Sequence, residues 1–365
     1  MNSKKRILIL NLGSTSVKGA IFEWDVHNLK CIFSFSKKLS EILDIKGFIL
    51  NLTENLEDFD AIAFRVVHGG KNYQKPEVIT FEILNRIKEA EILAPLHNSI
   101  FIQWYQEIKL FTNNKILLIA CFDSAFFYDL PEISKMYPIA VTLTKKFGLQ
   151  KRGFHGFAHK SMLAKLENNS KGKIITMQLG GGCSITATLD GKPIETSMGF
   201  TPLEGLMMGT RSGSIDPGII FYLLKKGVKS DDLEKLLNHD SGFKGLAGTD
   251  DLKKILEMKT KESQLALDLF CRNIAKYIGS YIVLLGGVDI LVFGGGIGEN
   301  SSLIRSKVMT YLNYSDIYID ENLNKLINVN CQKISAINSK AEIYIIKPDE
   351  EFEMAKEVHE LLINK

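Results

Sequence analysis

Two glycine-rich turns, far apart in the chain, have the composition of a phosphate-binding loop. The stretch Ile7–Phe22, ILILNLGSTSVKGAIF, has a second version at Ile174–Leu189, IITMQLGGGCSITATL. Each copy reads as an apolar strand, an amide residue, a Leu-Gly pair, a turn of small residues and a second strand. Without bulky side chains, the backbone N–H groups of such a turn can close around an anion. Two such hairpins indicate a duplicated fold that grips one polyphosphate from both sides; the alternative is a chance match between two common hairpins.

A third glycine-rich turn lies in the second half of the chain, in Val292–Ser302, VFGGGIGENSS. The pattern predicts a strand, a glycine turn and a helix that begins near Ser301, and the amino end of a helix attracts negative charge. The segment lacks the phosphate-loop pattern G-x-x-x-x-G-K-S/T, and its glycines are spaced wrongly for the dinucleotide fingerprint. Such turns also serve helix–strand packing. The three turns together favour a nucleotide-binding cleft.

The elements around these turns alternate between strands and helices, which is typical of an α/β fold. We expect further strands at 61–67, 116–121, 289–293 and 342–346, and helices at 80–90, 98–109, 158–166, 265–285 and 349–363. The segment 129–138 contains two prolines and is expected to cross between two lobes. Residues 196–218 show no sustained period, and a loop that long in a compact domain is usually functional.

The composition is that of a soluble globular protein large enough for two domains. The chain has 365 residues, of which 45% are hydrophobic and 24% charged. Its formal charge of +3 gives no reason to expect nucleic acid or a membrane surface as partner. The five cysteines are scattered, without a Cys-x-x-Cys pair, which favours reduced thiols in a cytoplasmic protein over a disulfide framework or a zinc site. The apolar runs 7–10 and 281–297 are too short or too interrupted for a signal peptide or a membrane span.

Specific sequence blocks then run through almost the whole chain. They are NLGSTSVK (Asn11–Lys18), RVVHGG (Arg65–Gly70), APLHN (Ala94–Asn98), FDSAF (Phe122–Phe126), GFHG with HK (Gly153–Lys160), LGGG (Leu179–Gly182), TSMGFTPLEGLMMGTRSG (Thr196–Gly213), GGIGENS (Gly295–Ser301) and DEE (Asp349–Glu351). In these blocks the sequence resembles the acetate kinases, the acetokinase family, which belong to the superfamily of sugar kinases and actin. The eighteen-residue block Thr196–Gly213 is highly specific to acyl kinases.

The resemblance implies a two-lobed α/β fold of the actin-like ATPase type, a duplicated ribonuclease H-like fold with the active site in an interdomain cleft. The expected N-terminal lobe comprises 1–127 and 352–365, and the expected nucleotide-binding lobe comprises 128–351, with a hinge near Phe127 and Glu351. Closure of such a cleft would exclude water, which competes as a phosphoryl acceptor.

The resemblance also implies an activity: reversible, Mg²⁺-dependent transfer of the ATP γ-phosphate to acetate, in a homodimer. Two alternatives stay open, a kinase for propionate or butyrate and a catalytically slow nucleotide-binding paralogue. A carboxylate clamp would distinguish an enzyme from a pure nucleotide switch. Pyrophosphate as the donor is disfavoured by the glycine turn at Gly294–Asn300.

Phosphoryl transfer is catalysed mostly by positioning and electrostatics, and a guanidinium is a fixed fork of donors for oxyanions. The resemblance therefore places Arg65 at the substrate and Arg211 at the transition state, the alternative being surface arginines in solvated pairs. His155 would donate to the phosphoryl oxygens. Asp123 matches the catalytic aspartate of the family; because acetate is already ionised and needs no base, we expect Asp123 to order magnesium and its waters. For His97 and His159, structural hydrogen bonding and catalysis both stay open.

The remaining expected site residues fall into three groups, each carried by the resemblance. Asn11 and Glu350 match the magnesium positions, although Glu350 would also suit a helix amino terminus. The expected acyl pocket comprises Val67, Leu96, Phe154 and Pro202, each of which could be ordinary core. The expected nucleotide contacts are Lys18, Gln178, Leu179, Gly180, Gly181, Gly182, Asp250, Asp251, Lys253, Gly296, Ile297, Gly298, Glu299 and Asn300.

The chain departs from the family pattern at several positions. Phe64 and Phe127 replace histidines, Gln178 and Gly181 replace a histidine and an asparagine, Ser214 replaces an aspartate, and Lys151-Arg152 replaces Arg-Tyr. The segment 247–253 aligns with the family's nucleotide loop only after a gap. Because none of these changes removes a residue assigned to phosphoryl transfer, we expect them to affect nucleotide affinity and rate more than reaction type.

Overall fold

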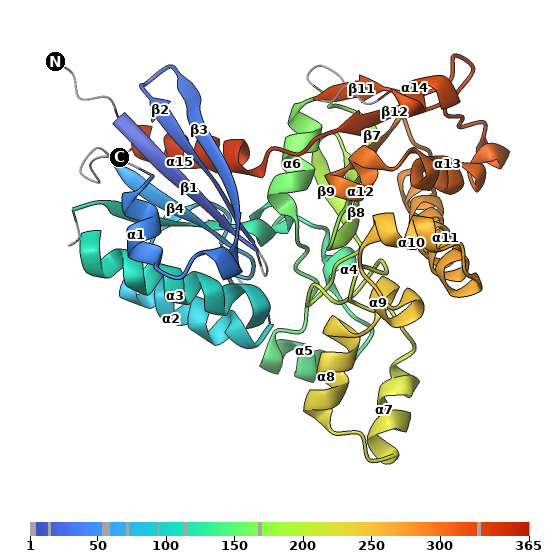
Figure 1. Cartoon of the computed structure of the whole chain (residues 1–365), viewed down its shortest axis with the longest axis horizontal. Helices are drawn as coiled ribbons and strands as arrows, with labels where there is room; N and C mark the ends of the chain where they lie inside the picture. Colours follow the sequence, from blue (N-terminus) through green and yellow to red (C-terminus); the bar gives the residue numbers. More distant parts are fainter. Residues whose placement is uncertain are drawn as a thin grey trace. The chain divides into compact units, whose positions relative to one another are not determined.

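The computed structural model describes residues 5–13, 16–52, 59–70, 73–93, 95–112, 115–166, 170–326 and 330–364, with the backbone alone for 92, 93 and 95–97. It consists of two compact units (Figure 1). The first comprises Met1–Tyr128, His155–Ser161 and Asp349–Lys365, and the second comprises Asp129–Phe154 and Met162–Pro348. Compared with the lobes expected from the sequence, the first unit also takes in 128, 155–161 and 349–351.

A six-stranded mixed sheet forms the centre of the first unit, in the order β3-β2-β1-β4-β6-β5. The strands are β1 (Lys5–Leu12), β2 (Ser16–Trp24), β3 (Leu29–Lys38), β4 (Ala61–Val66), β5 (Glu77–Val78) and β6 (Leu117–Phe122). Strands β1 and β2 form the predicted antiparallel hairpin, and β1, β4 and β6 run parallel to one another. The chain thus crosses over from β1 to β4 and from β4 to β6.

The second unit repeats this sheet. Its order is β11-β12-β10-β7-β8-β9, from strands β7 (Lys173–Leu179), β8 (Cys183–Leu189), β9 (Lys192–Thr196), β10 (Ile290–Gly294), β11 (Cys331–Lys333) and β12 (Glu342–Ile346). Strands β7 and β8 form the second predicted hairpin, while β7, β10 and β12 are parallel. Every strand of one sheet has its counterpart in the other, so the predicted duplication and the α/β class are confirmed.

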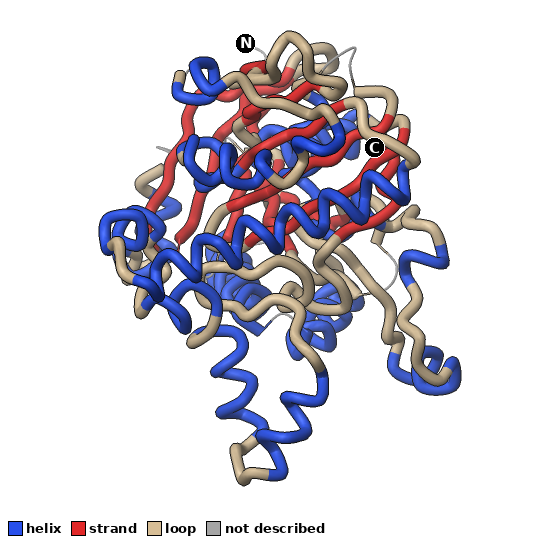
Figure 2. The backbone as a smooth tube through the Cα atoms, turned by 90° about the vertical axis from the view of Figure 1, so that its right-hand side faces the viewer, coloured by secondary structure: helices blue, strands red, loops and turns tan. Residues whose placement is uncertain are grey.

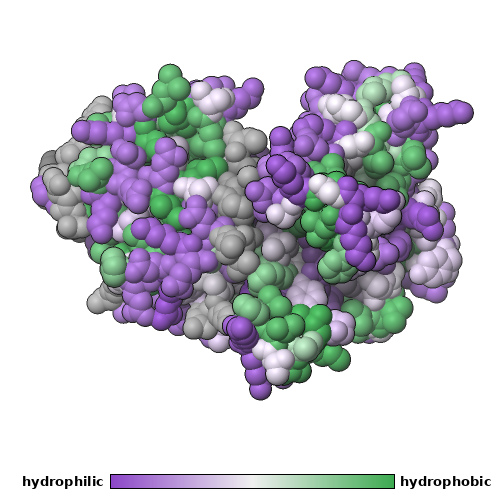
Figure 3. Space-filling view, turned by 90° about the horizontal axis from the view of Figure 1, so that it is seen from below, coloured by the Kyte–Doolittle hydropathy of each residue, from purple (hydrophilic) through white to green (hydrophobic). Residues whose placement is uncertain are grey.

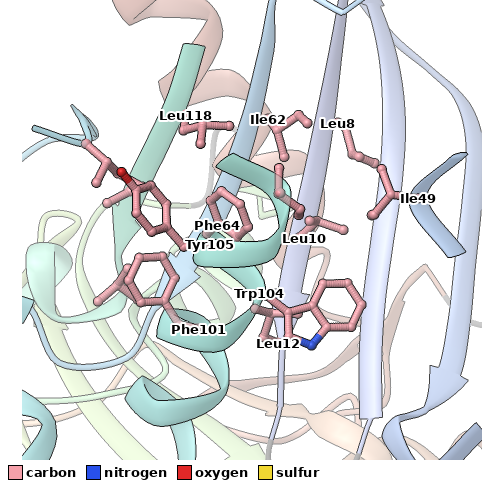
Figure 4. Close-up of a cluster of buried hydrophobic side chains, with 14 of the residues drawn as sticks. Leu8, Leu10, Leu12, Ile49, Ile62, Phe64, Phe101, Trp104, Tyr105 and Leu118 are labelled. Atoms are coloured by element: carbon pink, nitrogen blue, oxygen red, sulfur yellow. The ribbon is translucent and has the colours of Figure 1, made fainter. Parts of the chain in front are cut away.

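Helices cover both faces of the first sheet, because its strands alternate apolar residues between the two faces. On one face Leu8, Leu10, Phe64 and Phe101 belong to a large core, which also takes in residues of the helices α1 (Ile45–Leu50), α2 (Phe81–Glu89) and α3 (Pro95–Thr112) (Figure 4). The Phe64 ring meets that of Phe101 edge to face, with centroids 5.6 Å apart. Phe64 therefore extends the core of this face.

On the opposite face of the same sheet, the neighbouring residues of the strands pack against the last helix. Ile7 and Ile9 of β1 share this second core with Met354 and Val358 of α15 (Glu350–Ile363). Helix α6 (Gly156–Ala164) begins in the first unit, where Phe157 joins the same core. This α15-covered face is the one whose strand ends carry the site described below.

Figure 2 draws the helices of the chain in blue. The second unit contains more helices than the first. They are α4 (Glu132–Lys135), α5 (Val141–Phe147), α7 (Pro217–Lys225), α8 (Ser230–His239), α9 (Gly242–Ala247), α10 (Leu252–Met258), α11 (Lys261–Leu285), α12 (Gly295–Asn300), α13 (Ser302–Thr310) and α14 (Glu321–Lys325). Helix α11 begins four residues before the predicted start because Thr260 caps it. Between β9 and α7 the chain is irregular, as the missing period predicted.

The surface carries some apolar side chains among hydrophilic ones (Figure 3). Helix α7 buries none of its side chains and exposes Phe221 and Tyr222. In the described part of the chain, no helix combines the length and the apolar composition needed to cross a membrane.

Candidate active site

Three polar side chains occupy the carboxyl ends of the parallel strands in the first unit. In β1, Asn11 faces the same side of the strand as Ile7 and Ile9. In β4, Arg65 faces the same side as Ala61 and Ala63. Asp123 follows Ile119 and Cys121 of β6 in the same way. Since alternate residues of a strand face the same side, all three reach the α15-covered face, where α15 begins with Glu350 and Glu351. Ligands of open α/β sheets bind at this edge.

Arg65 lies at the centre of this group. Its Nη2 donates to Asp123 Oδ2 at 2.8 Å, and its Nη1 donates to Asn11 Oδ1 at 3.1 Å and lies 3.3 Å from Glu350 Oε2. Asn11 Nδ2 in turn donates to Glu350 Oε2 at 3.1 Å and to Glu351 Oε1 at 2.8 Å. The structure thus brings together the expected substrate residue, the expected catalytic aspartate and both expected magnesium residues.

Asp123 is completely buried, and its carboxylate is almost fully engaged. Besides Arg65, it accepts the backbone N–H of His155 at 2.7 Å and that of Phe157 at 3.4 Å. Burial alone would raise the pKa of Asp123, but the charge and hydrogen bond of Arg65 hold it below its usual value. For Arg65, burial alone would lower the pKa, yet Asp123 and Glu350 together raise it. The two groups are therefore an ion pair at neutral pH.

The acidic side chains outnumber the cations in this group. Burial and the neighbouring Glu350 raise the pKa of Glu351, while Lys18, across the hairpin from Asn11, acts in the opposite direction. Sequence reasoning placed Glu351 near the expected hinge but gave it no role in the site, although its position beside Glu350 at a helix start was a visible signal. Among the described residues, no three His, Cys, Asp or Glu side chains form a ready metal cage. A magnesium site needs fewer protein ligands, because the ion usually binds one or two carboxylates and keeps several waters.

The chain at His155 adopts a backbone conformation that is rare for a residue with a side chain. His155 has φ = 60°, and a side chain on Gly156 would collide with the carbonyl oxygen of Asp123. A left-handed residue of this kind costs on the order of 1–3 kcal/mol and persists only where the surroundings impose it. Here the backbone bond from His155 to Asp123 imposes it, so the expected catalytic histidine sits on a strained, fixed turn.

The roles of two histidines, His97 and His159, stayed open in the sequence analysis, and the structure describes the side chain of His159 but not that of His97. His159 is completely buried in α6, with its ring 6.1 Å from that of Phe127. Burial, and then the nearby charge of His155, lower its pKa to about 3, so it is neutral under ordinary conditions. His159 is thus a core residue, and Phe127 is its neighbour. The side chains of His97 and Leu96 lie outside the described residues.

The other expected acyl-pocket residues belong to different units. Val67, just after β4, is buried in the first unit. Phe154, which is buried, and Pro202, which is half-buried, belong to the second unit.

In the second unit, the two glycine-rich segments lie side by side. Gln178 at the end of β7 pairs with Gly294 at the end of β10. A Cβ on Gly295, whose φ is +76°, would come within 2.6 Å of the Leu179 carbonyl oxygen, so only glycine fits there. Gly181 and Gly296 are exposed, and a Cβ on either would meet nothing within 4 Å. Their backbones therefore face space that a ligand can enter.

One detail of this region differs from the prediction. The predicted helix near Ser301 is present as α13 (Ser302–Thr310), but the glycine run before it is not a turn. It is the first turn of helix α12, which contains Gly296, Ile297, Gly298, Glu299 and Asn300. Ser301 caps the next helix, α13. The pattern misled because glycine disfavours helices by about 1 kcal/mol per residue, and tertiary contacts outweigh that preference here.

The loop that carries Arg211 packs against the glycine turn of β7–β8. Gly209 N donates to Gly181 O at 3.3 Å, and a Cβ on Gly209 would lie 3.4 Å from that of Asp250. Arg211 Nη1 lies 3.9 Å from Met208 Sδ, and burial lowers the pKa of Arg211. Within the described ranges no carboxylate pairs with Arg211. Its charge is thus available to an anion.

The remaining expected nucleotide residues are less specific. Asp251 caps helix α10 by accepting Lys253 N at 3.0 Å, which is a structural role. Lys18 is exposed on β2 in the first unit. Of the departures, Ser214 Oγ accepts Gly205 N at 2.9 Å and Lys151 pairs with Glu195 at 2.7 Å, so both stabilise the neighbouring loop.

Comparisons with known proteins identify the family of this chain. The family model described as the acetokinase family matches residues 34–356. The acetate kinase of Sulfurimonas denitrificans is 41% identical over 317 residues, 85% of this chain and 80% of that protein. The acetate kinase of Flavobacterium johnsoniae is 37% identical over an alignment of 397 positions, which covers 98% of this chain and 100% of that protein.

Two solved structures are similar over nearly their whole length. A propionate kinase from Francisella tularensis has a TM-score of 0.86 at 34% identity and covers 97% of this chain and 98% of its own. Porphyromonas gingivalis acetate kinase has a TM-score of 0.84 at 30% identity and covers 99% and 100%. The resemblance seen in the sequence is confirmed, and the chain belongs to the acetokinase family.

Proposed function

We propose that this protein is an acetate kinase, which transfers the γ-phosphate of ATP to acetate and catalyses the reverse reaction. A carboxylate oxygen of acetate forms a bond to the γ-phosphorus, the bond from that phosphorus to the bridging oxygen breaks, and ADP leaves. The observation that carries the proposal is Arg211: a half-buried arginine that no carboxylate in the described ranges neutralises, next to an open glycine turn. Such a cation is suited to the charge on the phosphoryl oxygens.

Arg65 is the proposed carboxylate clamp. Asp123 and Asn11 fix its plane through one donor on each terminal nitrogen, and its buried Nε–H has no acceptor among the described residues. A guanidinium that is fixed in its plane by two partners is suited to bind a substrate carboxylate.

Asp123 fits a positioning role better than the magnesium role expected from the sequence. Its oxygens already accept Arg65 and two backbone N–H groups, and each of these bonds would have to weaken for a metal ion to bind. We propose that Asp123 orients Arg65 and the His155 turn. His155 then presents its ring to the phosphoryl oxygens.

Mg²⁺ fits the acidic group beside Arg65. Glu350 and Glu351 supply the hard oxygen ligands that this ion prefers, and the Asn11 oxygen could join them if its bond from Arg65 were released. Asp123 and Glu350 pair with Arg65 and Glu351 accepts from Asn11, so the carboxylates outnumber the guanidinium. When bound with ATP, the ion would neutralise phosphate charge. Glu350 is the residue proposed to hold it, directly or through water.

Propionate is the second candidate acceptor, because the similar solved structure from Francisella tularensis is a propionate kinase. One extra methylene changes binding in an apolar pocket by only about 1–3 kcal/mol. Acetate and propionate would therefore both be phosphorylated, at different rates.

A coupled assay with acetate, propionate and butyrate, each with ATP or pyrophosphate, tests the proposal. Arg211→Ala should lower turnover about a hundredfold or more, since one lost donor to a developing oxyanion typically costs ~10²–10³. Arg211→Lys should rescue poorly because an ammonium cannot form the fork. Arg86→Ala, which removes an exposed pair with Glu82 on α2, is the control and should leave the rate unchanged. Near-normal acetyl phosphate synthesis by Arg211→Ala would refute the assignment.

A homodimer in the cytoplasm completes the proposal. The exposed apolar side chains of α7 support self-association, and the free cysteines support a reducing compartment. Light scattering after gel filtration would test the dimer: a monomer at micromolar concentration would contradict it.

A further inference from the structure

We propose that Arg305 is a positioning residue for nucleotide binding: it holds the glycine-rich helix α12 in place from behind. This inference rests on the proposed function and on the expected nucleotide contacts at Gly296–Asn300, which belong to α12. Arg305 lies in α13 and is completely buried, which is rare for arginine.

The Arg305 guanidinium makes hydrogen bonds to neutral groups only. Nη1 donates to the carbonyl oxygens of Gly298 at 2.7 Å and Glu299 at 2.9 Å, both in the last turn of α12. Nε donates to Asn324 Oδ1 and Nη2 to the Asn324 carbonyl oxygen, each at 2.7 Å. In the part of the chain that is described, no carboxylate lies within ion-pair distance of Arg305. One side chain thus joins α12, α13 and α14.

Helix α12 needs such an anchor because its own composition provides little else. Its sequence is GGIGEN, so three of six residues have no side chain with which to pack, and Ile297 is the single apolar side chain. Glycine also disfavours the helical state. The carbonyl groups in the last turn of a helix lack intrahelical partners and require another donor. Arg305 supplies that donor to two of them.

The position of α12 determines the geometry of the two open glycine segments. At its start, Gly295 fits against the Leu179 carbonyl, and a Cβ on Gly180 would lie 3.9 Å from Gly296 N. At its end, the Arg305 bonds to Gly298 and Glu299 tie the helix to α13 and α14. A buried cation is costly to desolvate, and an apolar residue of the same volume is often as stable. The particular gain from arginine here is the fixed position of the α12 backbone.

The test compares ATP binding by the wild-type protein, Arg305→Met and Arg305→Lys, using thermal shift and calorimetry with magnesium present and acetate absent. Displacement of a binding element by about 1 Å can cost up to about a hundredfold. We expect the dissociation constant for ATP to rise about tenfold or more in Arg305→Met and less in Arg305→Lys. In steady-state assays, the KM for ATP should rise while the KM for acetate stays within about twofold.

Ser306→Ala is the matched control. Ser306 Oγ accepts from Asn324 Nδ2 and donates to Glu321, so it belongs to the same network but is not bonded to α12. This variant should lose some stability and keep its ATP affinity. Unchanged ATP affinity in a folded Arg305→Met protein, or an equal loss in Ser306→Ala, would overturn the inference. If Arg305→Met does not fold, unchanged affinity in Arg305→Lys has the same consequence.

The same experiment separates this inference from the proposed function. A wild-type protein that binds ATP but forms no acetyl phosphate refutes the proposed function alone, and the Arg305 comparison still holds. A wild-type protein that binds no ATP refutes both.

Discussion

Replacing His159 with glutamine should remove a specific sensitivity to acid from the fold. His159 is completely buried in the first unit, and its pKa falls from 6.5 to about 3 on folding, chiefly through burial. As the pH decreases below 6.5, the unfolded chain binds this proton while the folded protein does not. The free energy of unfolding contributed by this group is therefore constant above about pH 7 and decreases with the pH between 6.5 and 3.

The size of the effect follows from the two pKa values. At about pH 5.5, one unit below the pKa of the unfolded chain, the free energy of unfolding decreases by RT ln 11, or about 1.4 kcal/mol. At about pH 7.5 the decrease is below about 0.1 kcal/mol. The result hardly depends on the folded pKa as long as that value stays below about 4.5. His159→Gln should thus be less stable than the wild type at neutral pH, but its stability should decrease by about 1.4 kcal/mol less on acidification.

Urea unfolding at the two pH values measures this difference. The two tryptophans, Trp24 and Trp104, are buried in the first unit, so their fluorescence reports the unit that contains His159. His27→Gln, at an exposed bend of the same unit, is the control and should keep the wild-type pH dependence. Equal pH dependence of His159→Gln and wild type would refute the buried neutral histidine. A loss of turnover of about a hundredfold at neutral pH, in a folded variant, would instead indicate a catalytic donor.

Three further predictions concern the first unit. Glu350→Gln should raise the Mg²⁺ concentration needed for half-maximal rate with little change in melting temperature; if stability falls by up to ~1 kcal/mol and the Mg²⁺ dependence stays, Glu350 only supports the helix start. Asp123→Asn should lower kcat and the stability together, because it leaves Arg65 without its buried partner, a change of about 3–5 kcal/mol for such pairs; full stability in urea unfolding would contradict this. Wild type should prefer acetate to propionate, and Val67→Ala should reduce that preference mainly through the KM of the longer acid; an unchanged ratio would make Val67 ordinary core.

The duplicated architecture was predictable because the signal is local. Each hairpin is a contiguous stretch whose turn chemistry and strand pattern are visible in a few residues. Strands β4, β6, β10 and β12 were expected as separate strands. The crossovers that place them in the two sheets were not predicted. Helix α12 was predicted wrongly because its helical state depends on tertiary contacts, such as the bonds from Arg305 to Gly298 and Glu299. Contacts of this kind are not visible in a window of glycine residues.

The residues of the candidate site were visible in the sequence, but their arrangement was less so. Asn11, Arg65 and Asp123 lie 54 and 58 positions apart along the chain, and parallel register brings them together. Their residue types suggested oxyanion and metal chemistry, which is why Asp123 was assigned to magnesium. The pairing of Asp123 with Arg65 depends on which strands are adjacent, and the sequence alone does not specify that neighbourhood. Glu351 was expected only near the hinge, although its position beside Glu350 could have placed it in this group.

The charges of the two units indicate what kind of ligand they need. In the first unit, Asp123 and Glu350 pair with Arg65 and Glu351 accepts from Asn11, so the group retains negative charge that a cation would compensate. In the second, Arg211 has no carboxylate partner in the described ranges and lies beside an open glycine turn, so it would be compensated by an anion. Removing either group of charges from water is costly unless a partner is bound. The proposed substrate, a magnesium nucleotide, carries both a cation and phosphate oxygens, and so it provides a charge of each sign.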